Sequence, residues 1–459
     1  MASSKRGSSN TVLAVLFLGV LMAALDIAIV GPALPALREH FGIDDRAGAW
    51  IFTLYVFTNL LGAPVLAKFS DRIGRRPVYL LSLVLFAAGS AAAAAAPSFG
   101  VLLLGRVLQG FGAGGIFPVA SAVVGDTFPE ERRGFALGMI GAVFGLAFIL
   151  GPIAGALLLQ LGWQWIFLIN LPLAALVLAL GWMTLPDTKA AERRSFDALG
   201  LLLLTLLLGG MTIGTSALDA TRLWESLTTL QVWPFLLLAV VTAPLFWWAE
   251  HRATDPLLRP SLLGTRQLNL AHAITAGAGL GEGVIVFLPS LAVAAFGVAE
   301  STASYMTLPV VLAMAVGSPV AGRLLDKIGA KVVIVAGTAL LGAGMLLLGL
   351  LGATLWIYYV ACVLIGLGLA SLLGAPIRYI MLAEAPPEDR AAAQGAVTVF
   401  TGVGQLLSGA LVGALAASAG GGAAGYQFAY VVCAAIAGVL LLLALGLRGR
   451  RAAEAAAAA

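Results

Sequence analysis

The sequence predicts an all-α membrane protein with 14 transmembrane helices. Its 459 residues are 61% hydrophobic and only 10% charged, and their mean hydropathy is +1.02. A soluble chain of this length needs many more charged residues to cover its core. Apolar segments of about 20 residues, long enough to cross a bilayer core of about 30 Å, recur along the chain. We therefore expect two pseudo-symmetric six-helix bundles and a central helix pair.

The predicted spans fall into two groups of six that flank one pair. The first group is expected at about 11–37, 47–67, 77–96, 100–124, 135–160 and 165–185. The pair is expected at about 198–217 and 231–249. The last group is expected at about 268–295, 302–325, 331–351, 354–381, 392–416 and 426–447. The predicted domains are an N-terminal bundle (1–186), a central linker with the two extra helices (187–266), a C-terminal bundle (267–447) and a cytoplasmic tail (448–459).

Lysine and arginine residues gather on one side of this arrangement. An even number of spans places both termini on the same side, and 22 of the 26 lysine and arginine residues are assigned to it. Three lie on the other side, and Arg106 lies within a span. Arg378 is counted with the loop residues, and no lysine or arginine is expected in the middle of a span of the C-terminal half. Because cytoplasmic loops carry the excess of basic residues, we expect a cell-membrane protein (plasma or inner membrane) with both termini in the cytoplasm.

Asp26 lies inside the first apolar segment. A charge at that depth in a membrane costs roughly 2.5–3.5 kcal/mol on insertion scales, so such residues are usually functional. Burial disfavours the charged form of a carboxyl group, which would allow Asp26 to bind and release a proton. The alternative is a structural acid that a basic partner neutralises. At 1.5 Å per residue, Asp26 and Arg106 lie at nearly the same depth, so Arg106 is the candidate partner, and pairing is compatible with proton coupling.

A repeat supplies a counterpart to Asp26. Asp71 and Asp326 begin similar loops, after the second and the tenth span, and are 255 residues apart. Nearly the same offset, 256 residues, leads from Asp26 to Glu282 in the ninth span, where glycines alternate with other residues. Parallel halves of this kind characterise transporters that bind substrate between two bundles. We therefore interpret Glu282 as an unpaired, titratable acid that faces a shared cavity, although an unseen base could also pair with it.

The two repeated loops are candidates for a gate, although they could simply be solvated positive-inside charges. An aspartate beside an arginine at a helix end can bond to a neighbouring helix in one conformation and release it in another. The predicted gate residues are Asp71, Arg72, Gly74, Arg75, Arg76, Asp326 and Lys327.

Five segments carry a resemblance to a known family: 25–35, 71–76, 106–114, 145–155 and 163–172. They resemble the first-helix, cytoplasmic-gate, fourth-helix and antiporter motifs and the sixth-helix entry of the major facilitator superfamily, and within it those of the fourteen-span drug/proton antiporter family. The resemblance implies alternating access, a gate role for the repeated loops and a seal against leak. The residues of the sealing motif are Gly145, Gly151, Pro152 and Gly155, whose alternative role is simple helix packing.

Polar and aromatic residues of the spans are candidates for the substrate cavity: Asn59, Gln109, Tyr55, Phe117 and Phe287. Each could equally pack against a neighbouring helix or against lipid. The expected partners are a small amphipathic substrate, protons and the lipid bilayer. No nucleic acid, cofactor or metal is expected, and the chain is expected to act as a monomer. Cys362 and Cys433 lie in apolar runs, which makes a disulfide framework unexpected.

Together these features predict a proton-coupled antiporter that exports amphipathic or cationic organic compounds. An exporter of a lipid or another endogenous hydrophobic metabolite is the alternative, since the same fold and acids would serve it. A non-transporting membrane sensor is disfavoured, because it would need neither titratable acids within spans nor two gate loops. A primary pump is disfavoured because the sequence contains no Walker-type glycine-rich loop, and no enzymatic activity is expected.

Overall fold

The computed structural model describes residues 9–43, 45–186, 197–218, 222–386 and 389–449, and these contain helices but no strand. Fourteen spans in them are long and apolar enough to cross a membrane, which confirms the predicted number. The N-terminal spans are α1 (Ser9–Phe41), α2 (Asp45–Ile73), α3 (Arg75–Ala94), α4 (Phe99–Thr127), α5 (Glu130–Leu159), and α6 (Trp165–Leu168) with α7 (Asn170–Thr184). The central pair is α8 (Ala198–Ser216) and α10 (Trp233–Arg252).

The C-terminal spans include two that are interrupted. They are α11 (Arg266–Val284) with η3 (Ile285–Phe287) and α12 (Leu288–Phe296), α14 (Leu308–Ile328), α15 (Ala330–Leu351), α16 (Leu355–Leu373) with α17 (Ala375–Glu384), α18 (Arg390–Ser418) and α19 (Gly422–Leu445). The shorter helices are α9 (Leu223–Leu227), η2 (Pro260–Leu263) and α13 (Glu300–Tyr305). The tenth span was predicted from residue 302, but α13 is a separate helix and α14 starts beside Pro309, since proline favours the first helical turn.

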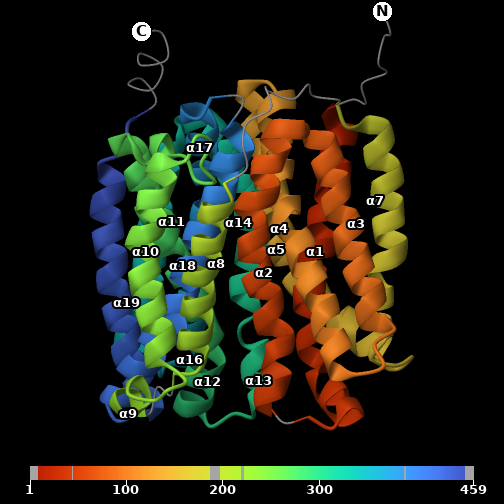
Figure 1. The fold of residues 1–459 in the computed structure, drawn as a ribbon. Coiled ribbons are helices and arrows are strands. Elements are labelled where there is room, and N and C mark those ends of the chain that lie inside the picture. The colour runs from red at the N-terminus through yellow and green to blue at the C-terminus, as the bar shows by residue number, and fades with distance from the viewer. Residues whose placement is uncertain (1–8, 44, 187–196, 219–221, 387–388, 450–459) are drawn as a thin grey trace, which may run out of the picture.

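The helices pack as two bundles, as predicted (Figure 1). Helices α1 to α7 contact one another, and so do α11 to α19. The bundles meet mainly where α5 packs on α14 and where α2 and α4 pack on α18. Helices α8 and α10 pack on each other, and α8 also contacts α2 and α18, so the central pair lies beside the junction of the bundles.

Helix α1 begins and α19 ends at the same end of the molecule, which we call the terminal face (Figure 1). The loops between α2 and α3 and between α14 and α15 also lie there. Gly74 and Gly329 form these two corners with φ angles of 105° and 86°. This left-handed region is disfavoured for residues that carry a Cβ, which explains why the repeat retains glycine at both positions.

Small residues bring α5 and α14 into close contact near the terminal face. A Cβ atom at Gly138 would lie 2.6 Å from the Ser318 carbonyl oxygen, and one at Gly145 would lie 2.7 Å from the Ala315 Cα atom. Gly145 of the predicted sealing motif therefore contacts the opposite bundle. Gly151 of the same motif packs against Ala28 of α1, within its own bundle. Both contacts fit close helix packing by small residues.

We predict that Gly138→Leu lowers stability, because no space exists for the added side chain between α5 and α14. Overpacking of this kind costs about 1–3 kcal/mol. The measurement is thermal unfolding of the purified protein in lipid nanodiscs. Gly438→Leu is the matched control, since a Cβ at Gly438 meets nothing within 4 Å. Equal melting temperatures for the two variants would contradict the packing.

Candidate functional site

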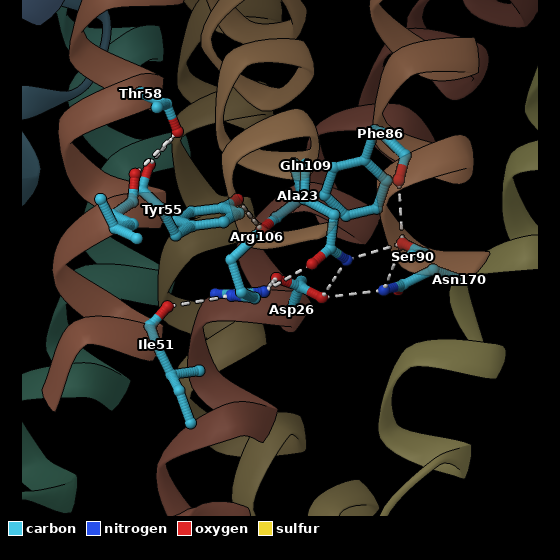
Figure 2. A network of polar contacts seen from close by, with 11 residues as sticks. Ala23, Asp26, Ile51, Tyr55, Thr58, Phe86, Ser90, Arg106, Gln109 and Asn170 are labelled. Atoms are coloured by element: carbon cyan, nitrogen blue, oxygen red, sulfur yellow. Dashed lines mark hydrogen bonds and ion pairs between the residues drawn. The ribbon is translucent and has the colours of Figure 1, made fainter. Parts of the chain in front are cut away.

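Asp26 of α1 lies in a buried polar network in the N-terminal bundle (Figure 2). Arg106 of α4 contacts it, with 2.5 Å between the Arg106 Nη1 and Asp26 Oδ2 atoms. Both side chains are 0% exposed. The proposed partnership of these two residues, which rested on their similar depths, is present in the structure.

Amide groups bind the second oxygen of this carboxylate. Gln109 Nε2 and Asn170 Nδ2 donate to Asp26 Oδ1 over 3.1 Å and 2.8 Å. The same two amides reach the Ser90 hydroxyl of α3, over 2.6 Å and 3.3 Å, and Ser90 donates to the Phe86 carbonyl. Helices α1, α3, α4 and α7 thus all contribute to one network. Both oxygens of the Asp26 carboxylate therefore have hydrogen-bond donors within the N-terminal bundle.

The Arg106 guanidinium is held on several sides. Its Nε donates to the Ile51 carbonyl over 3.1 Å, and its Nη1 donates to Gln109 Oε1 over 2.9 Å. The Tyr55 ring lies 4.2 Å from its central carbon, an arrangement that favours a cation. Only the Nη2 atom is buried without a hydrogen-bond partner among the described residues. Tyr55 itself donates to the Ala23 carbonyl over 3.3 Å.

Glu282 lies in α11, one turn before the 3₁₀ segment η3 that interrupts this span. Its described side-chain hydrogen bond is with Gln405 of α18. Gly279 and Gly283 pack directly against α18, so this glycine-rich helix face allows a close approach. The described partners of Glu282 and Asp26 belong to different bundles. The structure therefore does not join the two acids in one network.

The gate aspartates bind the opposite bundle. Asp71 accepts hydrogen bonds from the Ala391 and Ala392 amides, at 3.1 Å and 2.7 Å, in the first turn of α18. The first amides of a helix have no partner within it and attract negative charge, so Asp71 caps α18. Asp326 accepts from the Gly134 and Phe135 amides, both at 2.9 Å, in the second turn of α5. Each repeat thus uses its aspartate to bind backbone amides near the start of a helix in the other half.

Basic residues extend the contact between the bundles. Arg75 pairs with Asp71 and, at 2.9 Å, with Asp126 at the end of α4. Arg390 of α18 pairs with Asp126 from the other side, at 2.7 Å. The terminal face is therefore closed by a chain of charged groups that crosses from one bundle to the other.

The segment between α10 and α11 also reaches this face. Asp255 contacts Lys68 and Arg72 of α2, with N–O distances of 2.5 Å and 3.3 Å. Arg259 of the same segment contacts Asp255 and also Asp389, which directly precedes α18. Arg72 thus binds the central linker, a partner that sequence reasoning missed.

Two predicted gate residues lie away from the described contacts between the bundles. The Arg76 guanidinium lies over the Trp182 ring, 4.4 Å from its centroid, so it packs on α7 of its own bundle. Lys327 is exposed at the end of α14.

The predicted cavity residues do not gather in one place. Tyr55 and Gln109 belong to the buried Asp26 network. Asn59 lies where α2 packs on Gly114. Phe117 stacks on Phe144 at 5.2 Å, and Phe287 faces Tyr426 at 6.4 Å. Two further residues of the predicted sealing motif lie in α5: Gly155 is buried there, and Pro152 is part of the same helix.

Arg378 corrects the sequence-based charge map. It was assigned to a loop, but it lies in α17, inside the twelfth span, and is 5% exposed. The assignment of Arg378 to a loop is therefore wrong, although it lies toward the end of its span, which finishes at Glu384, and not in the middle. The chain resumes a helix after an interruption at Gly374, and this second helix carries Arg378. Ser90, Asn170, Gln405 and Arg378 were not assigned to the site, and a polar residue inside an apolar run was the available signal for each.

A family model described as Major Facilitator Superfamily matches residues 16–281 and 271–459. The chain belongs to the major facilitator superfamily. Two matched segments of similar length agree with the two bundles of the fold. Membership makes the chain a multi-pass membrane transporter and not an enzyme.

Relatives in this superfamily span most of the chain. The uncharacterized MFS-type transporter YfiU of Bacillus subtilis (strain 168) is 33% identical over 413 residues, which cover 89% of this chain and 80% of YfiU. The multidrug resistance protein Stp of Mycobacterium tuberculosis (strain ATCC 25618 / H37Rv) is 31% identical over 413 residues, covering 87% of this chain and 74% of Stp.

A solved structure of a superfamily member shows the same fold. The crystal structure of the human organic anion transporter MFSD10 (TETRAN) matches with a TM-score of 0.73 at 21% sequence identity, covering 96% of this chain and 100% of MFSD10.

We predict strong energetic coupling between Asp26 and Arg106. Removing one partner of a buried ion pair leaves an uncompensated charge and costs about 3–5 kcal/mol. Asp26→Leu and Arg106→Met should each destabilise the protein by about that amount, whereas the double variant should lose much less than the sum. Thermal unfolding in nanodiscs measures all three. Additivity within about 0.5 kcal/mol would show that the two residues are not coupled.

We predict that each gate aspartate protects the helix amides that it binds. Asp71→Asn should speed hydrogen exchange at the amides of 391 and 392, because a neutral side chain interacts less with a helix N-terminus. Asp326→Asn should act at 134 and 135, because a neutral amide oxygen is a weaker acceptor than a carboxylate. Exchange mass spectrometry of the first turn of α18 and the second turn of α5 measures both, and each variant is the control for the other. Unchanged exchange at the bound amides would refute the assignment.

Proposed function

We propose that the chain is a proton-coupled antiporter that exports amphipathic organic compounds, cationic ones among them, by alternating access between its two bundles. The observation that carries the proposal is the buried Asp26–Arg106 pair, a titratable group fixed inside a transporter bundle. Relatives named as multidrug transporters, Stp and MdtP of Bacillus subtilis (strain 168), each 31% identical, support the choice of cargo.

The orientation is part of the proposal. The terminal face carries most of the lysine and arginine residues, and the positive-inside rule places such a face in the cytoplasm. Both termini would then be cytoplasmic, in the cell membrane. With its gate contacts formed, the structure corresponds to a state that is closed toward the cytoplasm.

Protonation would change the Asp26 network in a defined way. The carboxylate accepts from Arg106, Gln109 and Asn170, and the pair with Arg106 is neutral as a whole. A proton on Asp26 would remove that compensation and leave Arg106 as a buried cation. Arg106 would then favour a new environment, and α4, on which it lies, also contacts α18 and α17 of the other bundle. A proton could thus alter the contact between the bundles.

Glu282 would be the second proton site. It lies beside the interruption of its span, and its described hydrogen-bond partner is a neutral amide, Gln405, instead of a base. A buried carboxyl group without a basic partner is protonated more easily than one that is paired to an arginine, because no opposite charge favours its ionised form. We propose that Asp26 and Glu282 bind protons and cargo in turn, so that binding of one displaces the other. Glu282 would act together with its hydrogen-bond partner Gln405, where α11 packs on α18.

The cycle would require the capped helices to separate. Opening toward the cytoplasm would break the bonds from Asp71 to α18 and from Asp326 to α5. The chain would work as a monomer, because both aspartates find their partners within the same polypeptide. Its partners would be the small cargo, protons and the bilayer, with no nucleic acid involved.

We predict that export driven by a pH gradient depends on both acids. Purified protein in proteoliposomes should move ethidium against its gradient when a pH gradient is imposed. Asp26→Asn and Glu282→Gln should each reduce this movement at least tenfold, since neither amide can bind the proton. Glu225→Gln, an exposed residue outside the spans, is the matched control and should keep full activity.

If Asp26→Asn and Glu282→Gln both pump as well as the wild type, proton coupling through these acids is refuted. Movement of labelled lipid without any movement of ethidium would replace the drug proposal with lipid export.

A further inference from the structure

Arg378 is a cation buried at the junction of the two bundles. It lies in α17, one turn after the interruption at Gly374, and its side chain is largely shielded from solvent. Helix α17 contacts α4 and α5 of the N-terminal bundle as well as several helices of its own bundle. Burying a charge in a membrane protein is unfavourable unless it is compensated, so the partners of Arg378 indicate what it is for.

Those partners are all neutral. The Arg378 Nη1 atom donates to Gln394 Oε1 over 3.2 Å, and the guanidinium carbon lies 3.8 Å from the Phe117 ring centroid. The Nε atom is buried without a hydrogen-bond partner. Within the described part of the chain, no acidic group forms an ion pair with Arg378. The guanidinium therefore has no described partner of opposite charge and has donors to spare.

Arg106 provides an internal comparison. It is also buried within a span, and it also lies against an aromatic ring, that of Tyr55. In contrast to Arg378, it contacts an acid, Asp26. The fold thus neutralises one buried arginine completely with its own carboxylate and leaves the other without an anion.

The surroundings of Arg378 come from both bundles. Phe117 belongs to α4, whereas Gln394 belongs to α18, in the same bundle as Arg378. Nearby, the Tyr379 hydroxyl donates to Glu130 Oε1 at the start of α5 over 2.9 Å. If the bundles separate at the terminal face, Phe117 moves away and the guanidinium is exposed on the wall of the opening. It would then be hydrated and free to bind an anion.

We propose that Arg378 recognises a negatively charged group of the cargo, such as a carboxylate, sulfonate or phosphate, so that the exported compounds include amphipathic organic anions. This inference rests on the proposed transport function and names a further substrate class. The planar guanidinium can bind such a group through two parallel hydrogen bonds. When the terminal face closes, Phe117 and Gln394 take the place of the anion, and the cargo loses its partner on the side from which it was loaded.

The competing explanation is purely structural. Gln394 Nε2 donates to the Arg378 carbonyl over 3.0 Å, so the two residues bond reciprocally and fix α17 to α18. That role uses one of the five guanidinium N–H groups, and it predicts equal effects on cargo of any charge. Charge selectivity therefore separates the two explanations.

The experiment compares two probes with the same aromatic skeleton. 8-Anilino-1-naphthalenesulfonate carries a sulfonate, and N-phenyl-1-naphthylamine is its neutral analogue. Their binding to the full chain in phosphatidylcholine nanodiscs is measured by fluorescence, with empty nanodiscs subtracted. We expect Arg378→Gln to weaken binding of the sulfonate at least tenfold and to change binding of the neutral probe less than twofold. Arg378→Lys should keep part of the preference, and Arg132→Gln, at an exposed position, should keep all of it.

The inference is overturned if the wild type does not bind the sulfonate above the empty-nanodisc signal, if Arg378→Gln binds it as the wild type does, or if both probes weaken equally. Should Arg378→Gln not fold, as judged by gel filtration, the lysine variant decides by the same ratio of the two probes. Nanodiscs with phosphatidylglycerol distinguish the source of the anion: competition by this lipid supports the site with a headgroup phosphate as its occupant.

The binding test and the export test can fail independently, so they distinguish the anion site from the proposed antiport. An Arg378-dependent preference for the sulfonate in protein that shows no export under a pH gradient would contradict the proposed antiport and support the anion site. Export of ethidium by protein that shows no preference between the two probes would support the proposed antiport and contradict the anion site.

Discussion

Backbone amides near the starts of two helices donate hydrogen bonds to two aspartates and hold the bundles together at the terminal face. Asp71 and Asp326 occupy equivalent positions in the repeat, and each binds a helix of the opposite half. Asp71 caps the first turn of α18, whose amides cannot be satisfied within that helix, whereas Asp326 binds the second turn of α5. The close packing of α5 on α14, which glycines permit, lies directly beside the Asp326 contact. Charge and shape therefore favour the same closed arrangement.

The buried ionisable residues inside the molecule have different kinds of partner. Asp26 and Arg106 form a pair whose remaining atoms are almost all used by amides, a hydroxyl and a carbonyl. Glu282 has an amide as its described partner, and Arg378 has an amide and an aromatic ring. In the first arrangement the two charges compensate each other, whereas neither Glu282 nor Arg378 has a partner of opposite charge among the described residues.

The sequence was sufficient for features that have a local or periodic cause. Hydrophobic length predicted the number of spans, the repeat predicted that Asp71 and Asp326 are equivalent positions, and helix rise placed Arg106 level with Asp26. Orientation of side chains about a helix axis could not be predicted this way, because one turn covers all directions within four residues. Tyr55 and Gln109 were therefore expected to line a cavity, although they face the bundle interior. Arg378 was counted with the loop bases because a charge near the end of an apolar run is usually at the membrane surface, and the run does not show that the side chain is buried between the bundles.

The segment that follows α10 forms ion pairs with both bundles. Asp255 pairs with Lys68 and Arg72 of the N-terminal bundle, and Arg259 pairs with Asp389, which precedes α18 of the C-terminal bundle. One short piece of chain cannot follow two bodies that move apart. If the bundles separate here, either the ion pairs of Asp255 with α2 or the ion pair of Arg259 with Asp389 must break. The central helix pair would then move with the bundle whose ion pairs remain intact.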